Sequence, residues 1–423
     1  MTTALIQKER TDMSIPVAKQ YIKDFEKLGF GVFVHFGLYS FLERGEWAAH
    51  ILKDKIDTDE YRKLTEKFNP DSMEKMVADI SKSGAKYITL TTRHHDGFSL
   101  YDTCGLSDFD VMHSAAGRDL IREFVDACRK YDIVPFLYHT TFDWWHPDFE
   151  GDFEKYLEYL RESVKILCTN YGKIGGVWFD GNWSKQGDVW QEDKLYGMIR
   201  SLQPDAMIIN NTGLSKHGEG SAYEEIDSVT FERGKAFPLD REGQKKYLAA
   251  EVCDSVNMHW GIADDINFKS PKTIIEALCR NRGAGANYLF NVGPDAMGHI
   301  PSFPNAMLEV IGKWMGLFGE AIYEGRPYWY SLDVKNFIMK SDKKAYIFCF
   351  DLLRKGSANV TYLSGSEGDF IFENCDLKIE NLHWMDNGEK LDFASENGNL
   401  RVNFSGYDYG MDYCVRVACA DLV

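Results

Sequence analysis

Short apolar runs alternate with amphipathic segments between residue 29 and about residue 323. In the segment 119–132, apolar residues recur at the spacing that puts them on one face of a helix. The short apolar runs between such segments are typical of buried strands, and the alternation indicates parallel βα units. The predicted strands are 31–37, 86–92, 133–139, 174–180, 206–211, 227–232, 247–252 and 287–293, and the predicted helices are 70–84, 119–132, 153–171, 192–203, 271–283 and 304–321.

Eight such strands favour an α/β fold of the (β/α)8 type. The helical pattern is weak around the sixth and seventh units, so we expect the barrel to be irregular there. After about Pro327 the pattern changes to β-type alternation with Asn-Gly turns. We therefore expect an irregular TIM-like barrel over residues 1–326 and a C-terminal antiparallel β-sandwich over residues 327–423. The β-type segments are 333–350, 369–380, 391–404 and 411–419.

Composition narrows the classes of partner. The chain of 423 residues carries 65 acidic and 48 basic residues, a net charge of -17, which argues against nucleic acid or anionic membranes as partners. No apolar run is long enough to predict a membrane span, and the first ten residues lack the apolar stretch of a signal peptide. The nine cysteines form no Cys-x-x-Cys pair, so we expect reduced thiols and a cytoplasmic location. The sequence is compatible with a homo-oligomer and does not determine the oligomeric state.

Polar or aromatic residues lie at or shortly after nearly every predicted strand end. Barrel enzymes keep their chemistry at the carboxyl ends of the strands, so these side chains are expected to converge on one pocket. Any one of them alone is more simply explained as a structural residue. The candidates are His35, Glu46, Trp47, His94, His95, Tyr138, Trp178, Asp180, Glu232, Glu251 and Trp260.

The stretch 173–183 indicates the kind of chemistry. Trp178 and Asp180 lie two residues apart on a predicted strand, so both side chains point to the same side. An indole beside a carboxylate suits sugar chemistry, because the ring stacks on the sugar and the carboxylate acts at the anomeric carbon. The alternative for this stretch alone is a core strand with a solvated Asp at its tip.

A metal site is the rival use of the histidines. His94 and His95 are adjacent, so a regular strand would point them apart, and both can face the pocket only if the strand bulges or ends there. No His-x-His or His-Glu-x-x-His motif occurs. We therefore expect no metal or cofactor, and histidines that bond to sugar hydroxyls.

Taken in order, these motifs resemble the α-L-fucosidases of glycoside hydrolase family 29. The resemblance runs from about residue 25 to residue 327, and the order and spacing of the motifs make it specific. The motifs are His35-Phe36-Gly37-Leu38-Tyr39-Ser40, Glu46-Trp47, Thr91-Thr92-Arg93-His94-His95-Asp96-Gly97-Phe98, Trp178-Phe179-Asp180-Gly181, residues 287–294, and Gly319-Glu320-Ala321-Ile322-Tyr323.

The resemblance implies a retaining, two-step hydrolysis of terminal α-L-fucosyl groups on oligosaccharides or glycoconjugates, without metal or cofactor. It implies that Asp180 is the nucleophile that forms a covalent fucosyl-enzyme. It favours Glu232 as the acid/base, with Glu251, which precedes a Trp-Gly pair, as the second candidate and Glu224 and Glu225 as further alternatives. If it is not the acid/base, Glu251 is expected to bind the substrate. The residues that would bind fucose are His35, Glu46, Trp47, His94, His95 and Tyr138 at its hydroxyls, and Trp178 and Trp260 at its apolar side and methyl group.

Two positions depart from the family pattern. Many members carry Trp where Phe36 stands, and many carry Arg where this chain has Asn210-Asn211-Thr212. The second departure affects a sugar contact and therefore the fine specificity. A related glycosidase with another sugar specificity and a non-catalytic fucose-binding protein remain the alternatives.

Overall fold

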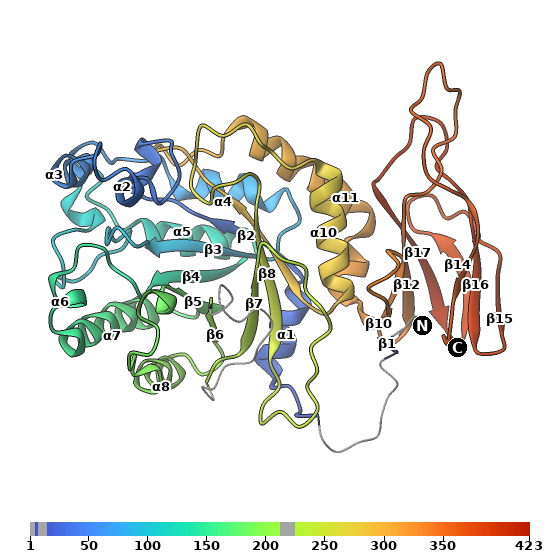
Figure 1. Ribbon diagram of the computed structural model, residues 1–423, viewed down its shortest axis with the longest axis horizontal. Helices are drawn as coiled ribbons and strands as arrows, with labels where there is room; N and C mark the ends of the chain where they lie inside the picture. The colour runs from blue at the N-terminus through green and yellow to red at the C-terminus, as the bar shows by residue number, and fades with distance from the viewer. Residues whose placement is uncertain (1–4, 7–14, 212–224) are drawn as a thin grey trace.

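A computed structural model describes residues 5–6, 15–211 and 225–423. Eight parallel strands close into a barrel, which confirms the predicted fold class (Figure 1). Each of the eight predicted barrel strands is present, with ends shifted by a few residues. The strands are β2 (Phe30–Val34), β3 (Tyr87–Arg93), β4 (Val134–Thr140), β5 (Gly176–Asp180), β6 (Met207–Asn210), β7 (Ser228–Glu232), β8 (Ala249–Ser255) and β9 (Asn287–Val292).

Helices surround the barrel strands, and capping side chains set where several of them begin. Ser72 caps α4 by accepting a hydrogen bond from Glu74 N, and Asp119 caps α5 by accepting one from Arg122 N. The long helices are α1 (Gln20–Leu28), α4 (Met73–Ser81), α5 (Leu120–Lys130), α7 (Phe153–Asn170), α8 (Glu192–Leu202), α10 (Pro271–Gly283) and α11 (Ser302–Glu324), and the short ones are α2 (Ala48–Ile51), α3 (Thr58–Arg62) and α6 (Pro147–Glu150).

Of the two units in which the helical pattern is weak, only one lacks its helix in the described residues. Residues 233–248, between β7 and β8, contain no helix. The seventh unit differs from the expectation, because α10 follows β8 and completes it. Much of the loop between β6 and β7 lies outside the described residues.

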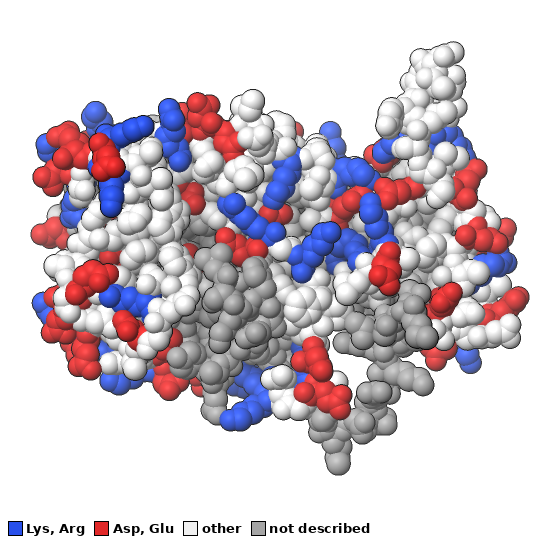
Figure 2. Space-filling model, in the orientation of Figure 1, with Lys and Arg blue, Asp and Glu red and all other residues white. Residues whose placement is uncertain are grey.

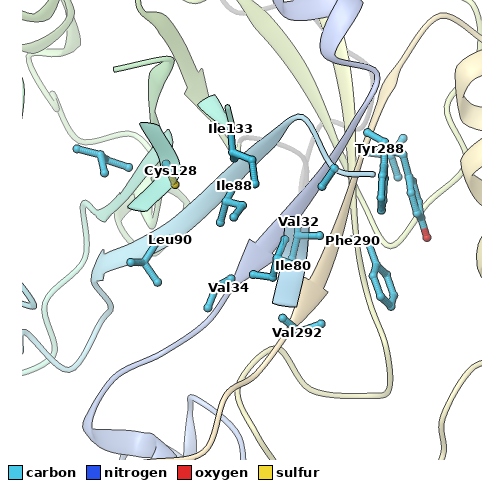
Figure 3. Close-up of a cluster of buried hydrophobic side chains, with 14 of the residues drawn as sticks. Val32, Val34, Ile80, Ile88, Leu90, Cys128, Ile133, Tyr288, Phe290 and Val292 are labelled. Atoms are coloured by element: carbon cyan, nitrogen blue, oxygen red, sulfur yellow. The ribbon is translucent and has the colours of Figure 1, made fainter. Parts of the chain in front are cut away.

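The core between strands and helices explains why the barrel strands are apolar throughout. Every residue of β2, β3 and β9 is buried, as in parallel strands covered on both sides. Figure 3 shows the outward-facing side chains of these strands gathered with residues of α4 and α5. The labelled members include Val32 and Val34 of β2, Ile88 and Leu90 of β3, Phe290 and Val292 of β9, Ile80 of α4 and Cys128 of α5.

Helix α1 closes the amino-terminal end of the barrel. Its buried residues Ile22 and Phe25 belong to an interior cluster with Tyr87, Phe136 and Met207, which lie at or near the starts of β3, β4 and β6. The amino-terminal end is therefore filled with apolar side chains. The opposite end, where the strands finish, is where a site has room to form.

The C-terminal residues form two antiparallel sheets, and side chains from both sheets pack in a second core. The first sheet has the order β1-β10-β11-β12-β17-β14, so β1, from the amino terminus, pairs with β10 at its edge. In Figure 1, α10 and α11 lie between the barrel strands and this sheet, and Trp314 Nε1 of α11 donates to Val415 O at 2.9 Å. The strands are β1 (Leu5–Ile6), β10 (Arg326–Tyr330), β11 (Phe337–Lys340), β12 (Lys344–Phe350), β13 (Gly368–Phe372), β14 (Ile379–Trp384), β15 (Phe393–Glu396), β16 (Asn399–Phe404) and β17 (Val415–Leu422).

The surface carries both signs of charge. Figure 2 shows Lys and Arg with Asp and Glu among them on the face that it draws. Among the described helices, none is long and apolar enough to cross a membrane.

Candidate active site

A cavity of about 240 Å³ lies at the carboxyl ends of the barrel strands. Every predicted site residue except Glu251 lines it, although these residues are spread over more than two hundred positions of the chain. The volume is below the roughly 300–1,000 Å³ of sites for drug-sized ligands, which suits one sugar ring. The lining residues are Phe33, His35, Glu46, Trp47, His94, His95, Tyr138, Trp178, Asp180, Trp183, Asn211, Glu232, Cys253 and Trp260.

The two adjacent histidines both line the cavity because the strand is irregular there. β3 ends at Arg93, and its pairing with β4 shifts register between Thr91 and Arg93. The ring centroids of His94 and His95 lie only 4.2 Å apart, although their positions in a regular strand would point them to opposite sides. Both conditions expected from the sequence, a bulge and a strand end, are therefore met.

Asp180 ends β5 and has several hydrogen-bond partners. Its Oδ1 accepts from Trp183 Nε1 at 2.9 Å, and its Oδ2 accepts from Tyr138 Oη at 3.3 Å and lies 3.4 Å from His95 Nε2. Burial alone would raise the pKa of this carboxyl, but the interactions with His95 and Trp183 outweigh it and lower the pKa. Asp180 is therefore held as a carboxylate.

Glu232 ends β7 and has the opposite pKa shift. Burial raises the pKa of its carboxyl, the hydrogen bond from Asn211 lowers it in part, and the negative charge of Asp180 raises it further. Asn211 Nδ2 donates to Glu232 Oε2 at 2.7 Å and lies 3.4 Å from Asp180 Oδ1. One amide therefore joins two carboxyl groups whose pKa values are driven apart.

His35 and His94 are held as neutral imidazoles. Burial lowers the pKa of His35 to about 3, although its Nδ1 lies 2.6 Å from Asn291 Oδ1. Burial, with the nearby His95 and His35, lowers the pKa of His94 well below its usual value. Nδ1 of His94 is buried and has no hydrogen-bond partner among the described residues. A neutral imidazole can donate from one nitrogen and accept at the other, as a sugar hydroxyl requires.

Glu46 and two tryptophans shape the rim of the cavity. Glu46 Oε2 accepts from the backbone N–H groups of Trp260 and Gly261 at 3.1 and 2.8 Å, which fixes the loop after β8. The Trp260 ring stacks on His35 with centroids 5.4 Å apart, and the Trp47 ring lies 5.1 Å from His95. The cavity thus combines polar donors with aromatic faces.

Glu251 corrects one prediction, because it does not line the cavity. It is fully buried in β8, where it accepts hydrogen bonds from Tyr87 Oη at 2.7 Å and Trp178 Nε1 at 2.8 Å. Burial raises the pKa of its carboxyl to about 7, although both bonds act to lower it. Glu251 therefore holds the Trp178 ring in place through a hydrogen bond, and it does not reach the cavity in which a sugar would bind.

The position of Glu251 follows from the length of β8. The predicted strand ended at residue 252, whereas β8 continues to Ser255. Side chains two residues apart point to the same side, so Cys253 takes the place in the cavity wall that the shorter strand assigned to Glu251.

Besides Cys253, three lining residues had not been assigned as site residues: Phe33, Trp183 and Asn211. Phe33 shares a strand face with His35, and Trp183 follows Asp180 by three residues, so their positions along the chain were available signals. Asn211 was noticed only as a departure from the family pattern. Thr212, in the same departure, and the alternative acid/base Glu224 lie outside the described residues. The other alternative, Glu225, does not line the cavity and accepts a hydrogen bond from Arg200 Nε at 3.0 Å. In the described part of the chain, no group of three or more His, Cys, Asp or Glu is arranged to hold a metal ion.

Comparisons with known proteins show the family to which the chain belongs. The family model described as Alpha-L-fucosidase matches residues 5–320. A Caenorhabditis elegans relative is 30% identical over 331 residues, which span 71% of this chain and 66% of that protein. Tissue alpha-L-fucosidase of Bos taurus is 28% identical over 359 residues, 77% of this chain and 73% of its own length.

A solved structure shows the same architecture. Alpha-L-fucosidase isoenzyme 1 from Paenibacillus thiaminolyticus superimposes with a TM-score of 0.79 at 29% identity, covering 96% of this chain and 99% of that one. The superposition includes the barrel and the C-terminal sheets. With the family model matching most of its length, this chain belongs to the alpha-L-fucosidase family, glycoside hydrolase family 29.

Proposed function

We propose that this protein is a retaining exo-α-L-fucosidase that hydrolyses terminal α-L-fucosyl linkages, with Asp180 as nucleophile and Glu232 as acid/base. The observation that carries the proposal is the pair of carboxyl groups joined by Asn211, one with a lowered and one with a raised pKa. Two carboxyls in environments that separate their pKa values are suited to different roles in one reaction.

The chemistry follows from these protonation states. The carboxylate of Asp180 attacks the anomeric carbon, and the bond from that carbon to the leaving oxygen breaks as Glu232 gives that oxygen its proton. Glu232, now ionised, takes a proton from water, and this water attacks the anomeric carbon of the fucosyl-enzyme. Fucose leaves with its original configuration, Asp180 is a carboxylate again and Glu232 is protonated again.

The separation of the carboxyl groups supports the retaining mechanism. From the two distances to Asn211 Nδ2, Asp180 Oδ1 and Glu232 Oε2 are at most about 6 Å apart, whereas inverting enzymes need about 6.5–9.5 Å and retaining enzymes about 5–5.5 Å. This bound on the two oxygens that share Asn211 favours the short separation of a retaining enzyme over the longer one that leaves room for a water.

The remaining lining residues support a single small sugar as the bound group. We assign the hydroxyl contacts to His35, His94, His95, Tyr138 and Glu46, whose side chains bring donors and acceptors into the cavity. Aromatic rings make up the rest of the wall and suit the apolar side and methyl group of fucose. The rings are Phe33, Trp47, Trp178, Trp183 and Trp260.

The test is hydrolysis by the wild type of a panel of 4-nitrophenyl glycosides. We expect turnover of the α-L-fucoside with little activity on the other sugars, and the α-anomer of fucose as the first product in a proton NMR time course. Turnover of a different glycoside alone would mean that the enzyme is specific for another sugar. β-Fucose as the first product would contradict the retaining mechanism. Binding of fucose without any turnover would favour a binding protein.

Replacing Asn211 by Ala is expected to shift the alkaline limb of the pH profile of kcat/KM to higher pH. The hydrogen bond from Asn211 stabilises the ionised form of Glu232, so its loss raises the pKa of Glu232 further. Glu232 must be protonated to start the reaction, so the decline of activity on the alkaline side should begin at higher pH. The matched control is Asn210→Ala, because Asn210 bonds to Tyr196 Oη and Asn182 instead. An alkaline limb that stays in place in Asn211→Ala would contradict the role given to Glu232.

A further inference from the structure

Arg233 directly follows Glu232 and has an unusual backbone. Its φ is 50°, in the left-handed region that non-glycine residues rarely adopt. Its N–H still donates to Cys253 O at 2.8 Å, which continues the pairing of β7 with β8 by one residue. Such conformations cluster at functional sites, where the surrounding structure holds them. The turn takes Arg233 out of the alternation of β7, and its side chain lies over Trp260, a residue that lines the cavity.

The guanidinium of Arg233 is held over a ring of the cavity wall. It lies 4.8 Å from the centroid of Trp260, and its Nη2 donates to Met258 O at 2.9 Å. Its Nε and Nη1 donate to no described residue, and the side chain is exposed. Stacking and one hydrogen bond thus orient the planar group and leave further donors for a ligand.

The charge of Arg233 is notable in so acidic a chain. Across the described part of the chain, no carboxylate forms an ion pair with it, although the protein has a net charge of -17. Two acidic residues are bonded to the same loop, and both are already engaged. The Asp265 carboxylate binds Met258 N, His259 Nδ1 and Asn267, and the Glu46 carboxylate binds the backbone N–H groups of Trp260 and Gly261. The charge of Arg233 acts on the neighbouring Glu232 carboxyl, but no described carboxylate is within ion-pair distance of the guanidinium. A positioned guanidinium that is bonded to no described carboxylate is suited to an anionic group from outside the chain.

We propose that Arg233 forms an aglycone subsite that binds an anionic group, a carboxylate or a sulfate ester, on the sugar to which fucose is attached. The inference rests on the proposed function, because the acid/base protonates the leaving oxygen and the aglycone must therefore depart beside Glu232. The residue after Glu232 is then next to the aglycone. A guanidinium binds carboxylate and sulfate oxygens through paired N–H groups.

The experiment compares three α-L-fucosyl-galactose disaccharides that differ only at C6 of galactose: a hydroxymethyl, a carboxylate or a sulfate. Each disaccharide is tested with fucose on each of the other galactose hydroxyls in turn, so that the linkage preference of the enzyme is measured in the same experiment. The wild type is expected to show a kcat/KM about fivefold to tenfold higher for at least one anionic substrate than for the neutral one. The ratio should fall toward one as salt is added, because the guanidinium is exposed.

Arg233→Gln should bring the ratio of anionic to neutral kcat/KM close to one. The control is Lys235→Gln, which removes a nearby exposed cation and should keep the wild-type ratio. A wild-type ratio of one or less, or a fall of all three activities by the same factor in Arg233→Gln, would overturn the inference. The second result would mean that Arg233 acts on Glu232 and not on the aglycone. Failure of the wild type on every fucoside, 4-nitrophenyl α-L-fucoside included, would contradict the proposed function and this inference with it.

Discussion

Asp180→Asn is expected to lower kcat/KM for 4-nitrophenyl α-L-fucoside by more than about 10⁴-fold, because the amide cannot form the covalent intermediate. The change keeps the size of the side chain, and the amide can still accept from Trp183 Nε1 through its oxygen and donate to Tyr138 Oη through its NH2 group. The thermal midpoint should therefore move little, so a loss of activity at unchanged stability separates chemistry from folding. The measurement is steady-state kcat/KM for 4-nitrophenyl α-L-fucoside, beside a melting curve of both proteins.

Mass spectrometry gives an independent check on the nucleophile. A 2-fluoro fucosyl fluoride should label the wild type on the peptide that contains Asp180, because the fluorine slows release of the covalent intermediate. Asp180→Asn should remain unlabelled. A label on another carboxyl group, or a variant that keeps more than about a tenth of wild-type activity, would remove Asp180 from its role.

Glu232→Ala is expected to have an effect that depends on the leaving group. For fucosyl disaccharides, whose leaving oxygen needs a proton, kcat/KM should fall by about 10²–10⁴-fold. For aryl fucosides with acidic leaving groups the loss should be much smaller, because such groups depart without protonation. Azide should restore turnover by attacking the fucosyl-enzyme without base assistance, and the product should be the α-fucosyl azide.

Glu251 provides the matched comparison for this prediction. Glu251→Gln retains one acceptor for Trp178 Nε1 and one donor toward Tyr87 Oη, so it should lower activity on all substrates to a similar and smaller extent. If Glu251→Ala were rescued by azide and Glu232→Ala were not, the assignment of the acid/base would be wrong.

The alternation of apolar and polar positions was sufficient to predict the eight barrel strands and the change to antiparallel strands near residue 327. This works because side chains in a strand alternate and those on a helix face recur with a longer period, so burial leaves its mark locally. The residues at the strand ends were predicted for the same reason, since parallel strands that form a barrel bring their carboxyl ends together.

Local patterns fail where burial is decided by neighbours distant in sequence. The extra residues of β8 pair with β9, so the depth of Glu251 depends on a strand more than thirty residues away. Likewise, β1 pairs with β10 across most of the chain, and nothing near Leu5 and Ile6 predicts it.

The sequence by itself determined which side chains stand at the strand ends and that a carboxylate follows Trp178. Only the tertiary structure decided which of two glutamates reaches the cavity, and that Asn211 joins Glu232 to Asp180. It also decided the opposite pKa shifts of these carboxyl groups. The physical reason is that residue types and short periodicities belong to neighbouring positions, whereas depth, dielectric environment and hydrogen-bond partners arise when separate strands meet.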